Sequence, residues 1–302
     1  MKLYFYFFFI FFTFLFLFYP GESEYIKLFA YNRRLFAQEK SVSHFIEARV
    51  PYVKTNTVPS LTAEGIYIVD LPSFTPVLEK NIHGRFLPAS TAKMITALVS
   101  LDIYKPEDII TVKRVLEDGQ VMGLIQGEKI TVENLLYGIL VHSGNDAAYA
   151  MADNYGFERF IDLMNKKGKA LSMNETRFNN PAGLDEFDQY TSPYDLSLAA
   201  RALLQKPLLK KIVGTKEIVV SDIDFQYFHT LANVNKLLGE IQGIGGLKTG
   251  YTENAKENLI SFYQKSGHQF IIVILRSDDR FEDTREAINW LNVNVDYLTL
   301  TQ

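Results

Sequence analysis

Residues 87–101 read Leu-Pro-Ala-Ser-Thr-Ala-Lys-Met-Ile-Thr-Ala-Leu-Val-Ser-Leu, and from Ala89 the apolar positions recur at helical spacing. Ser90 and Lys93 are one turn apart, so both side chains lie on one face near the helix N-terminus. The helix dipole there stabilises developing negative charge. A serine in this position can attack a carbonyl while the lysine takes its proton. Because S-x-x-K occurs about once by chance in a chain of this length, the pattern needs support from elsewhere.

Two further polar patterns follow later in the chain. Ser143-Gly144-Asn145 lies between two runs with helical spacing, and its glycine lets a loop bring a hydroxyl and an amide toward one point. Lys248-Thr249-Gly250 follows the glycine-rich residues 243–247. On an edge strand it offers a cation and a hydroxyl to a carboxylate, beside a glycine that leaves room for an extended peptide. Each pattern alone also fits a helix cap or a β-bulge, so their joint occurrence is the signal.

The overall composition excludes several other chemistries. The 302-residue chain contains no cysteine, which excludes disulfides, cysteine zinc ligands and thiol nucleophiles. A formal net charge of −4 leaves no basic surplus for phosphate groups, so we expect no nucleic-acid partner. The five histidines have no metal-binding spacing and no H-E-x-x-H context, so we expect no metal and no other cofactor.

The order of the expected elements predicts an α+β fold. Strand-like stretches span residues 65–70, 76–79, 259–264 and 270–275, in two apparent hairpins. Helical spacing covers residues 89–101, 132–141, 145–154, 157–171, 193–204 and 280–291. Because strands stand near both ends and helices lie between them, we expect one central, mostly antiparallel sheet built from distant segments and covered by a helical block.

The three polar patterns, in this order, are the motif set of the penicillin-recognising serine acyl-enzymes. From about Gly65 to Leu291 the chain resembles the D-alanyl-D-alanine carboxypeptidase family of low-molecular-weight penicillin-binding proteins, serine peptidase family S11. The resemblance implies a β-lactamase/D,D-peptidase-like fold. Five stretches carry it: Leu87–Met94, Leu140–Ala148, Asn180–Leu184, Tyr190–Leu196 and Gly246–Thr252. One departure is Ala255-Lys256-Glu257, where the family usually has a small residue and a glycine.

The resemblance implies a mechanism on peptidoglycan stem peptides. Ser90 would attack the carbonyl between the two terminal D-alanines while Lys93 accepts its proton, and water would then hydrolyse the acyl-enzyme. Asn145 would hold the substrate amide and the Lys93 amine, and Ser143 would relay a proton to the leaving nitrogen. The backbone N–H groups of Ser90 and Tyr251 would bind the oxyanion.

The resemblance also implies a set of substrate-binding residues: Lys248, Thr249, Gly250, Tyr251 and Arg280. Lys248 and Thr249 would bind the terminal carboxylate, and burial together with Lys248 would promote loss of the proton from Lys93. Arg280 is the nearest match to the family's carboxylate-pocket arginine, with a solvated surface arginine as the alternative. β-Lactam antibiotics are the implied covalent inhibitors.

Other functions remain open. A class A-like β-lactamase prefers aspartate where Gly144 stands and needs a glutamate for deacylation, for which Glu186 is the nearby candidate. A D,D-endopeptidase or transpeptidase would carry the same motifs. The non-enzymatic alternative is a catalytically silent cell-wall peptide-binding module, against which the intact Ser90 and Lys93 argue. His142 is expected to be structural, because neighbouring residues on a helix point apart.

The N-terminal segment Leu3–Tyr19 carries no charge and is interrupted only by Thr13. It is long for the apolar core of a signal peptide and short for a membrane span. Because residues 18–22 offer no A-x-A cleavage pattern, we favour an uncleaved signal anchor over a cleaved signal peptide.

The expected domain organisation follows from this segment. We predict a signal peptide or anchor over residues 1–20, a linker over residues 21–60 and a D,D-peptidase domain over residues 61–302. The domain would lie outside the cytoplasm, on the periplasmic or cell-wall side, held to the membrane by residues 3–19. The positive charges at residues 27, 33 and 34 conflict with that orientation under the positive-inside rule.

Overall fold

The computed structural model describes residues 2–18, 48–55, 57–117 and 119–300, which divide into two units. The first unit contains helix α1 (Lys2–Phe18), and the second spans Arg49–Leu300. Most of the linker predicted over residues 21–60 lies outside the described residues. Its last part does not behave as a linker, because the folded unit begins at Arg49.

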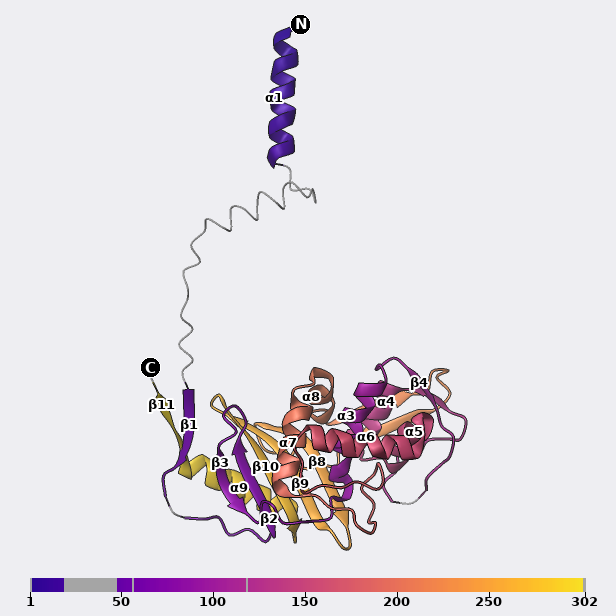
Figure 1. The fold of residues 1–302 in the computed structure, drawn as a ribbon, viewed down its shortest axis with the longest axis vertical. Helices are drawn as coiled ribbons and strands as arrows, with labels where there is room; N and C mark the ends of the chain where they lie inside the picture. The colour runs from indigo at the N-terminus through magenta and orange to yellow at the C-terminus, as the bar shows by residue number, and fades with distance from the viewer. Residues whose placement is uncertain (1, 19–47, 56, 118, 301–302) are drawn as a thin grey trace. The chain divides into compact units, whose positions relative to one another are not determined.

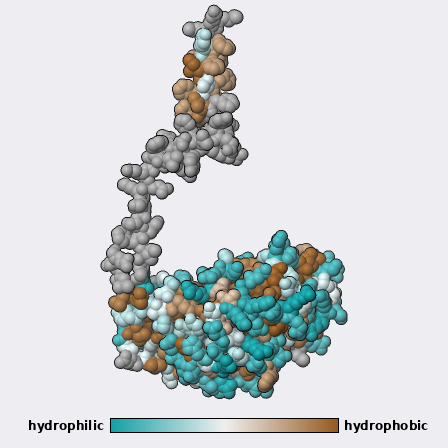
Figure 2. Space-filling model, viewed as in Figure 1, coloured by the Kyte–Doolittle hydropathy of each residue, from teal (hydrophilic) through white to brown (hydrophobic). Residues whose placement is uncertain are grey.

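Helix α1 consists almost entirely of aromatic and aliphatic residues. Phe5 stacks on Phe9 and Phe8 on Phe12, because side chains four residues apart are neighbours on a helix. Thr13 Oγ1 donates a hydrogen bond of 2.6 Å to the Phe9 carbonyl, which hides its one hydroxyl. Much of the exposed surface of α1 is brown in Figure 2. Of the helices that the structure describes, none combines the length and the hydropathy that a membrane crossing requires.

A five-stranded antiparallel sheet forms the centre of the second unit (Figure 1). Its spatial order is β3-β2-β10-β9-β8. The strands are β2 (Gly65–Asp70), β3 (Pro76–Lys80), β8 (Ile244–Thr252), β9 (Lys256–Lys265) and β10 (His268–Ser277). Both predicted hairpins are present, as β2–β3 and β9–β10. Because β2 pairs with β10, the sheet joins distant segments, which confirms the predicted antiparallel sheet.

The two faces of this sheet pack against different layers. Strand β10 alternates, with Ile271, Val273 and Leu275 packing against the helical block and Phe270, Ile272 and Ile274 packing on the α9 side. This follows from the two-residue period of a strand. All six side chains are buried, so β10 is hydrophobic on both faces.

Helices fill the middle of the chain, close to the predicted ranges. They are η1 (Ala89–Ala92), α3 (Lys93–Ile103), α4 (Val132–Leu140), α5 (Asn145–Tyr155), α6 (Phe157–Ala170), α7 (Pro193–Leu204), α8 (Pro207–Val213) and α9 (Arg280–Asn294). Side chains cap several of them: Thr131 accepts from the Asn134 N–H and Ser192 from the Asp195 N–H. Two details differ from expectation: α8 was not predicted, and the helix expected from Ala89 begins as a 3-10 turn.

Three small two-stranded sheets complete the fold, and no strand was predicted at these places. They are β1 (Ala48–Val53) with β11 (Val295–Leu300), β4 (Ile109–Thr111) with β5 (Lys129–Thr131), and β6 (Glu217–Ser221) with β7 (Phe228–Ala232). Strands of three residues are too short for a periodic signal. The backbone N–H of Ile223, in the β6–β7 turn, donates to the Lys129 carbonyl at 2.8 Å and fixes that hairpin to β5.

Candidate active site

The three polar patterns meet at one hollow beside the edge strand β8. Its volume is about 420 Å³, and it is lined by Ser90, Gly119, Gln120, Ser143, Val234, Thr249, Gly250, Tyr251, Glu257 and Arg280. Ser90 comes from η1, Ser143 from the loop between α4 and α5, and Thr249 from β8. Lys93 is the first residue of α3, Asn145 is the first residue of α5 and Lys248 lies on β8, and all three are buried. The structure therefore brings together every residue that the sequence singled out for chemistry.

Ser90 belongs to a turn that the sheet holds in an unusual conformation. The preceding residue, Ala89, has φ 45°, in the left-handed region that non-glycine residues rarely adopt. The carbonyls of Leu87 and Pro88 accept hydrogen bonds from Asn258 Nδ2, at 3.0 and 3.3 Å. Because Asn258 is a buried residue of β9, these bonds fix the turn to the sheet.

Gly250 lets β8 lie directly against this turn. A Cβ atom on Gly250 would stand 3.0 Å from the Ala89 Cβ, 3.1 Å from the Ser90 nitrogen and 3.2 Å from the Pro88 carbonyl oxygen. Such distances are tighter than ordinary contacts, and two of these atoms belong to the backbone. The glycine was expected to leave room for a peptide, and the structure adds that it leaves room for the serine turn.

Lys93 is fully buried, and its ammonium group faces three oxygen atoms. Nζ donates to Ser90 Oγ at 2.8 Å, to Asn145 Oδ1 at 2.7 Å and to the Ala182 carbonyl at 3.0 Å. Burial lowers the pKa of Lys93 to about 7, against the opposing effect of Asp146. An amine with this pKa is partly neutral at pH 7 and is placed to accept the Ser90 proton.

The Ala182 carbonyl is aimed at Lys93 by a compact turn. Asn180 Oδ1 accepts hydrogen bonds from the backbone N–H groups of Ala182, Gly183 and Leu184, at 3.2, 2.7 and 3.0 Å. Gly183 has φ +79°, and a Cβ there would stand 1.7 Å from the Ala89 carbonyl oxygen. The stretch therefore requires glycine at this position. The sequence indicated this turn only through the family resemblance.

The second lysine, Lys248, is also buried and contacts the second pattern. Its Nζ donates to Ser143 Oγ at 2.8 Å and to the Thr249 carbonyl at 2.9 Å. Burial lowers its pKa well below the ordinary lysine value, and the charges of Lys93 and Arg280 lower it further. Ser143 has φ 62°, another left-handed residue at the hollow. Each lysine therefore has a serine hydroxyl within hydrogen-bond distance.

Arg280 is buried at the start of α9, not solvated on the surface. Its Nη1 donates to the Gly250 carbonyl at 2.8 Å, and its backbone N–H donates to Glu257 Oε2 at 2.9 Å. Burial lowers the pKa of the guanidinium. Its Nε is buried without a hydrogen-bond partner among the described residues. Nε lies 3.9 Å from Glu257 Oε2, so its ion pair is long and the guanidinium can still attract an anionic group of a ligand.

Asp146 holds one wall of the hollow in place, a role that sequence reasoning did not assign to it. Its carboxylate accepts hydrogen bonds from the backbone N–H groups of Met122, Gly123 and Leu124, at 2.9, 2.9 and 3.0 Å. These bonds hold the segment 119–124, whose first residues line the hollow. Its position directly after the Ser-Gly-Asn pattern was the available signal.

Two weaker sequence candidates, Glu186 and His142, lie outside this chemistry. Glu186, considered for a β-lactamase water, hydrogen-bonds to Asn180 Nδ2 at 3.2 Å and does not line the hollow. His142 Nε2 lies 2.9 Å from Gln120 Nε2. Among the described residues, no group of three or more His, Asp or Glu side chains is arranged to hold a metal ion.

The turn after Thr252 departs from the family pattern in sequence. Lys256 stands where the family usually has glycine, and it adopts φ 53°, in the left-handed region.

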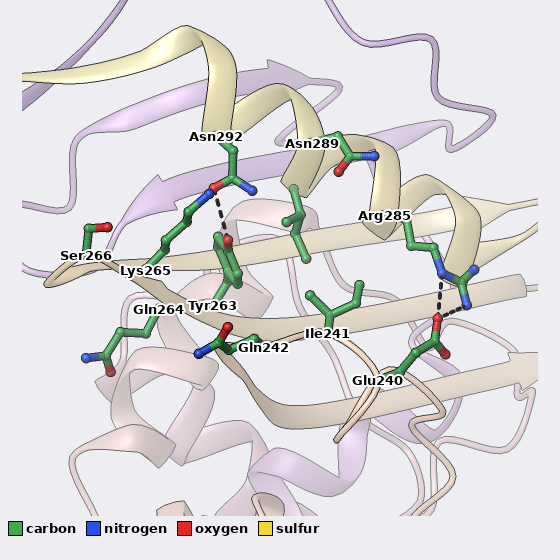
Figure 3. A pocket seen from close by; sticks show the side chains of 11 residues that line it. Glu240, Ile241, Gln242, Tyr263, Gln264, Lys265, Ser266, Arg285, Asn289 and Asn292 are labelled. Atoms are coloured by element: carbon green, nitrogen blue, oxygen red, sulfur yellow. Dashed lines mark hydrogen bonds and ion pairs between the residues drawn. The ribbon is translucent and has the colours of Figure 1, made fainter.

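A second hollow, of about 640 Å³, lies between α9 and the end of β9 (Figure 3). Arg285 Nε and Nη2 donate to Glu240 Oε1 at 3.0 and 2.8 Å. Tyr263 donates its hydroxyl proton to Asn292 Oδ1 at 3.0 Å. None of the three polar patterns contributes a lining residue to this hollow.

Comparison with known proteins places the chain in a family. A family model described as D-alanyl-D-alanine carboxypeptidase matches residues 52–279. The D-alanyl-D-alanine carboxypeptidase DacF of Bacillus subtilis is 34% identical over 239 residues, which are 76% of this chain and 61% of that protein. DacD of Escherichia coli K12 is 30% identical over 268 residues, 82% of this chain and 67% of that protein. The chain thus spans less than two thirds of the Bacillus relative.

Solved structures show the same fold. The Streptomyces K15 DD-transpeptidase has a TM-score of 0.73 at 29% identity, covering 78% of this chain and 98% of that chain. The D-alanyl-D-alanine carboxypeptidase DacD from Francisella tularensis has a TM-score of 0.74 at 27% identity, covering 80% and 73%. These similarities confirm the predicted family and the predicted combination of helices with an antiparallel sheet.

Proposed function

Because the chain belongs to the D-alanyl-D-alanine carboxypeptidase family, we propose that it removes the terminal D-alanine from peptidoglycan stem peptides through an acyl-enzyme on Ser90. One observation carries the proposal: Lys93 Nζ lies 2.8 Å from Ser90 Oγ and is fully buried. Its lowered pKa of about 7 suits a general base near neutral pH. A lysine that only served solubility would be exposed and charged.

Acylation uses the two hydroxyl–lysine pairs in turn. Ser90 Oγ attacks the carbonyl between the two D-alanines and passes its proton to Lys93. The resulting oxyanion accepts hydrogen bonds from the backbone N–H groups of Ser90 and Tyr251, which supply the electrostatic stabilisation. Ser143, bonded to Lys248, gives its proton to the leaving nitrogen as the C–N bond breaks and takes up the proton that Lys93 accepted from Ser90, so that both residues return to their starting states. D-Alanine then departs as a neutral amine.

The terminal carboxylate of the substrate binds where positive charge collects at the hollow. Thr249 offers a hydroxyl, and Lys248 and Arg280 offer cationic groups from the strand and the helix. Arg280 supports this role, because its Nε makes no hydrogen bond among the described residues and lies 3.9 Å from Glu257 Oε2, too far for a hydrogen bond. In the second half of the reaction, water attacks the acyl carbon, the bond to Ser90 Oγ breaks and the serine recovers its proton.

A second candidate reaction differs only in the group that attacks the acyl-enzyme. The Streptomyces K15 neighbour is named a DD-transpeptidase, which favours transfer to an amine as the alternative to hydrolysis. Cleavage of a D,D cross-link uses the same residues on a branched substrate. A β-lactamase is less favoured, because Glu186 contacts Asn180 instead of lining the hollow.

The site of action that fits this substrate is outside the cytoplasmic membrane. The apolar segment that forms α1 would direct the chain to the translocation machinery and hold it at the membrane. β-Lactam antibiotics would acylate Ser90 in the same way as the peptide, because they present a strained amide to the same nucleophile.

A fluorescent penicillin tests the nucleophile directly. The wild-type chain should be labelled covalently, and Ser90→Ala should not. Lys265→Met, which alters a lysine at the second hollow, is the matched control and should be labelled like the wild type. Labelling of Ser90→Ala, or no labelling of the wild type, contradicts the proposal.

Mass spectrometry of a muropeptide that ends in D-Ala-D-Ala identifies the reaction. Loss of one alanine supports the carboxypeptidase. A cut cross-link supports the endopeptidase, and a mass increase with an added amine supports the transpeptidase. No change in any muropeptide leaves the silent binding module.

A further inference from the structure

His229 is a buried titratable residue that the mechanism above does not use. It lies on β7, only 6% exposed, with its ring between two acceptors. Nε2 is 2.8 Å from Glu128 Oε1, and Nδ1 is 3.2 Å from the Met122 carbonyl oxygen. The other carboxylate oxygen of Glu128 accepts from the Ile125 N–H at 2.9 Å. The side chains of His229 and Glu128 therefore hydrogen-bond to each other and to two backbone groups, the Met122 carbonyl and the Ile125 N–H.

The partners determine how many protons the pair holds. A carbonyl oxygen only accepts, so Nδ1 of His229 must carry a proton to bond Met122. Nε2 and Glu128 Oε1 then share one further proton, either as imidazolium and carboxylate or as neutral imidazole and carboxylic acid. If that proton is lost, a lone pair of Nε2 faces a carboxylate oxygen at 2.8 Å, and the contact becomes repulsive.

The segment that this pair holds connects to the candidate active site. Both backbone polar groups of Met122 are hydrogen-bonded. Its N–H donates to Asp146, and its carbonyl oxygen accepts from His229. Two residues earlier, the Gln120 carbonyl accepts the Asn145 N–H at 2.7 Å. Gly119 and Gln120 line the hollow beside Ser90. A shift of this segment would therefore move Asn145, whose amide oxygen contacts Lys93.

We propose that His229, paired with Glu128, is a positioning residue of the acyl-transfer reaction: it fixes the segment 119–124 and through it the placement of Asn145 against Lys93. The inference rests on the proposed function. It involves no contact between His229 and the substrate. The hairpin β6–β7 is thereby assigned a part in catalysis, because it carries His229 into the block that holds the serine–lysine pair.

The charges around His229 determine the direction of its pH dependence. Glu128, before β5, raises the pKa of the imidazole most, and Asp146 on α5 raises it as well. Asp222 in the β6–β7 turn bonds the backbone of its own turn, at Gln226 and Tyr227, and Lys129 on β5 is exposed. With a raised pKa, the shared proton is held to higher pH than on a free imidazole and is lost as the pH rises through that pKa.

Four variants separate positioning from simple stability. His229→Leu removes both hydrogen bonds, and His229→Asn keeps an amide donor for the Met122 carbonyl. Glu128→Gln keeps the shape and removes the charge. His83→Leu, at an exposed histidine whose ring contacts Tyr194, is the matched control. Each is measured for the acylation rate by fluorescent penicillin across neutral and alkaline pH, and for kcat and KM of D-alanine release. Circular dichroism measures the folded fraction.

We expect His229→Leu to lower kcat about 10- to 100-fold with little change in KM, because misplacement of reacting groups by about 1 Å costs that much. His229→Asn should recover part of the rate. Glu128→Gln should move the alkaline fall in rate to lower pH, an effect that a purely structural role would not produce.

Two results overturn the inference in distinguishable ways. A wild type that penicillin does not label contradicts the proposed function, and this inference with it. A labelled wild type whose folded His229→Asn and Glu128→Gln variants keep the wild-type rate and pH profile contradicts this inference alone. If His229→Leu does not fold, these two variants still decide the matter.

Discussion

The two hollows beside the central sheet differ in how they hold charge. On the face toward the helical block, Lys93 and Lys248 are buried, and the oxygens that their ammonium groups contact belong to hydroxyls, an amide and carbonyls. On the α9 side, the charges at the second hollow are solvated and paired, as in Arg285 with Glu240 (Figure 3). Burying a cation without a carboxylate destabilises a fold. Such an arrangement persists where chemistry requires it.

The volumes of the two hollows do not show which one is the candidate active site. The second hollow has about 640 Å³ and the candidate active site about 420 Å³, so the larger space is the one without the motif residues. The smaller hollow is distinguished by two lysines with lowered pKa values and by an arginine nitrogen that makes no hydrogen bond among the described residues. Buried charged groups, and not the volume of the hollow, therefore identify the candidate site in this protein. Four experiments test this difference.

The largest effect is expected from Lys93→Met. Methionine fills a similar volume but cannot accept a proton, so the rate of acylation by penicillin should fall about 100- to 10,000-fold. Lys265→Met, at the second hollow, should leave the rate unchanged. Stopped-flow labelling measures both. Equal rates for the two variants would show that the buried lysine is not the base.

Asp146→Ala should combine a rate loss with a stability loss. Three backbone N–H groups of residues 122–124 would lose their acceptor, which lowers the free energy of unfolding by about 2–4 kcal/mol. The freed segment should lower the acylation rate about 10- to 100-fold.

The matched carboxylate for Asp146 is Asp70, on the α9 side. Asp70 is buried and accepts from the Ser73 N–H at 2.9 Å and the Tyr297 hydroxyl at 2.7 Å. Asp70→Ala should lower stability by a similar amount, yet leave the rate per folded molecule unchanged. Urea unfolding and penicillin labelling test the pair, and a rate loss in Asp70→Ala would remove the distinction between the faces.

The pH dependence should follow the pKa of Lys93, about 7. Below it the amine is protonated and cannot accept the Ser90 proton, so kcat/KM should rise about tenfold per pH unit up to that pKa and stop rising above it, before the alkaline fall that follows loss of the proton shared by His229 and Glu128. The lowered pKa of Lys93 also makes the free energy of unfolding depend on pH. Between that pKa and 10.5 the unfolded lysine holds a proton that the folded one lacks, so stability rises with pH. The difference in Tm between wild type and Lys93→Met across this range isolates the term. A flat kcat/KM profile through neutrality would contradict the assignment.

The smallest effect is expected from Arg285→Ala. Its ion pair with Glu240 is partly exposed, and such pairs contribute about 0–1 kcal/mol. We expect no change in acylation rate and a small change in Tm. A strong loss of activity would mean that the second hollow takes part in catalysis.

The sequence by itself was enough for the family and for most elements. Apolar residues at every second position predict strands, and apolar residues three and four positions apart predict helices. Each spacing places the apolar side chains on the one face that the element buries. The motif at Ser90 and Lys93 carries its geometry locally, since residues three apart on a helix are neighbours. The short sheets gave no such signal, and α8 was missed with them.

Only the tertiary structure determined which charged side chains of the site are buried and how their pKa values shift. Nothing in the pattern Lys-Thr-Gly says that Lys248 loses its solvent, or that Arg280 lies buried against the Gly250 carbonyl. The same holds for Asp146 and His229, whose partners in the segment 122–128 are distant in the sequence. A pKa shift depends on desolvation and on charges from distant segments. Sequence spacing records only neighbours along the chain, so the burial that makes Lys93 a base exists only once the sheet and the helical block have closed around it.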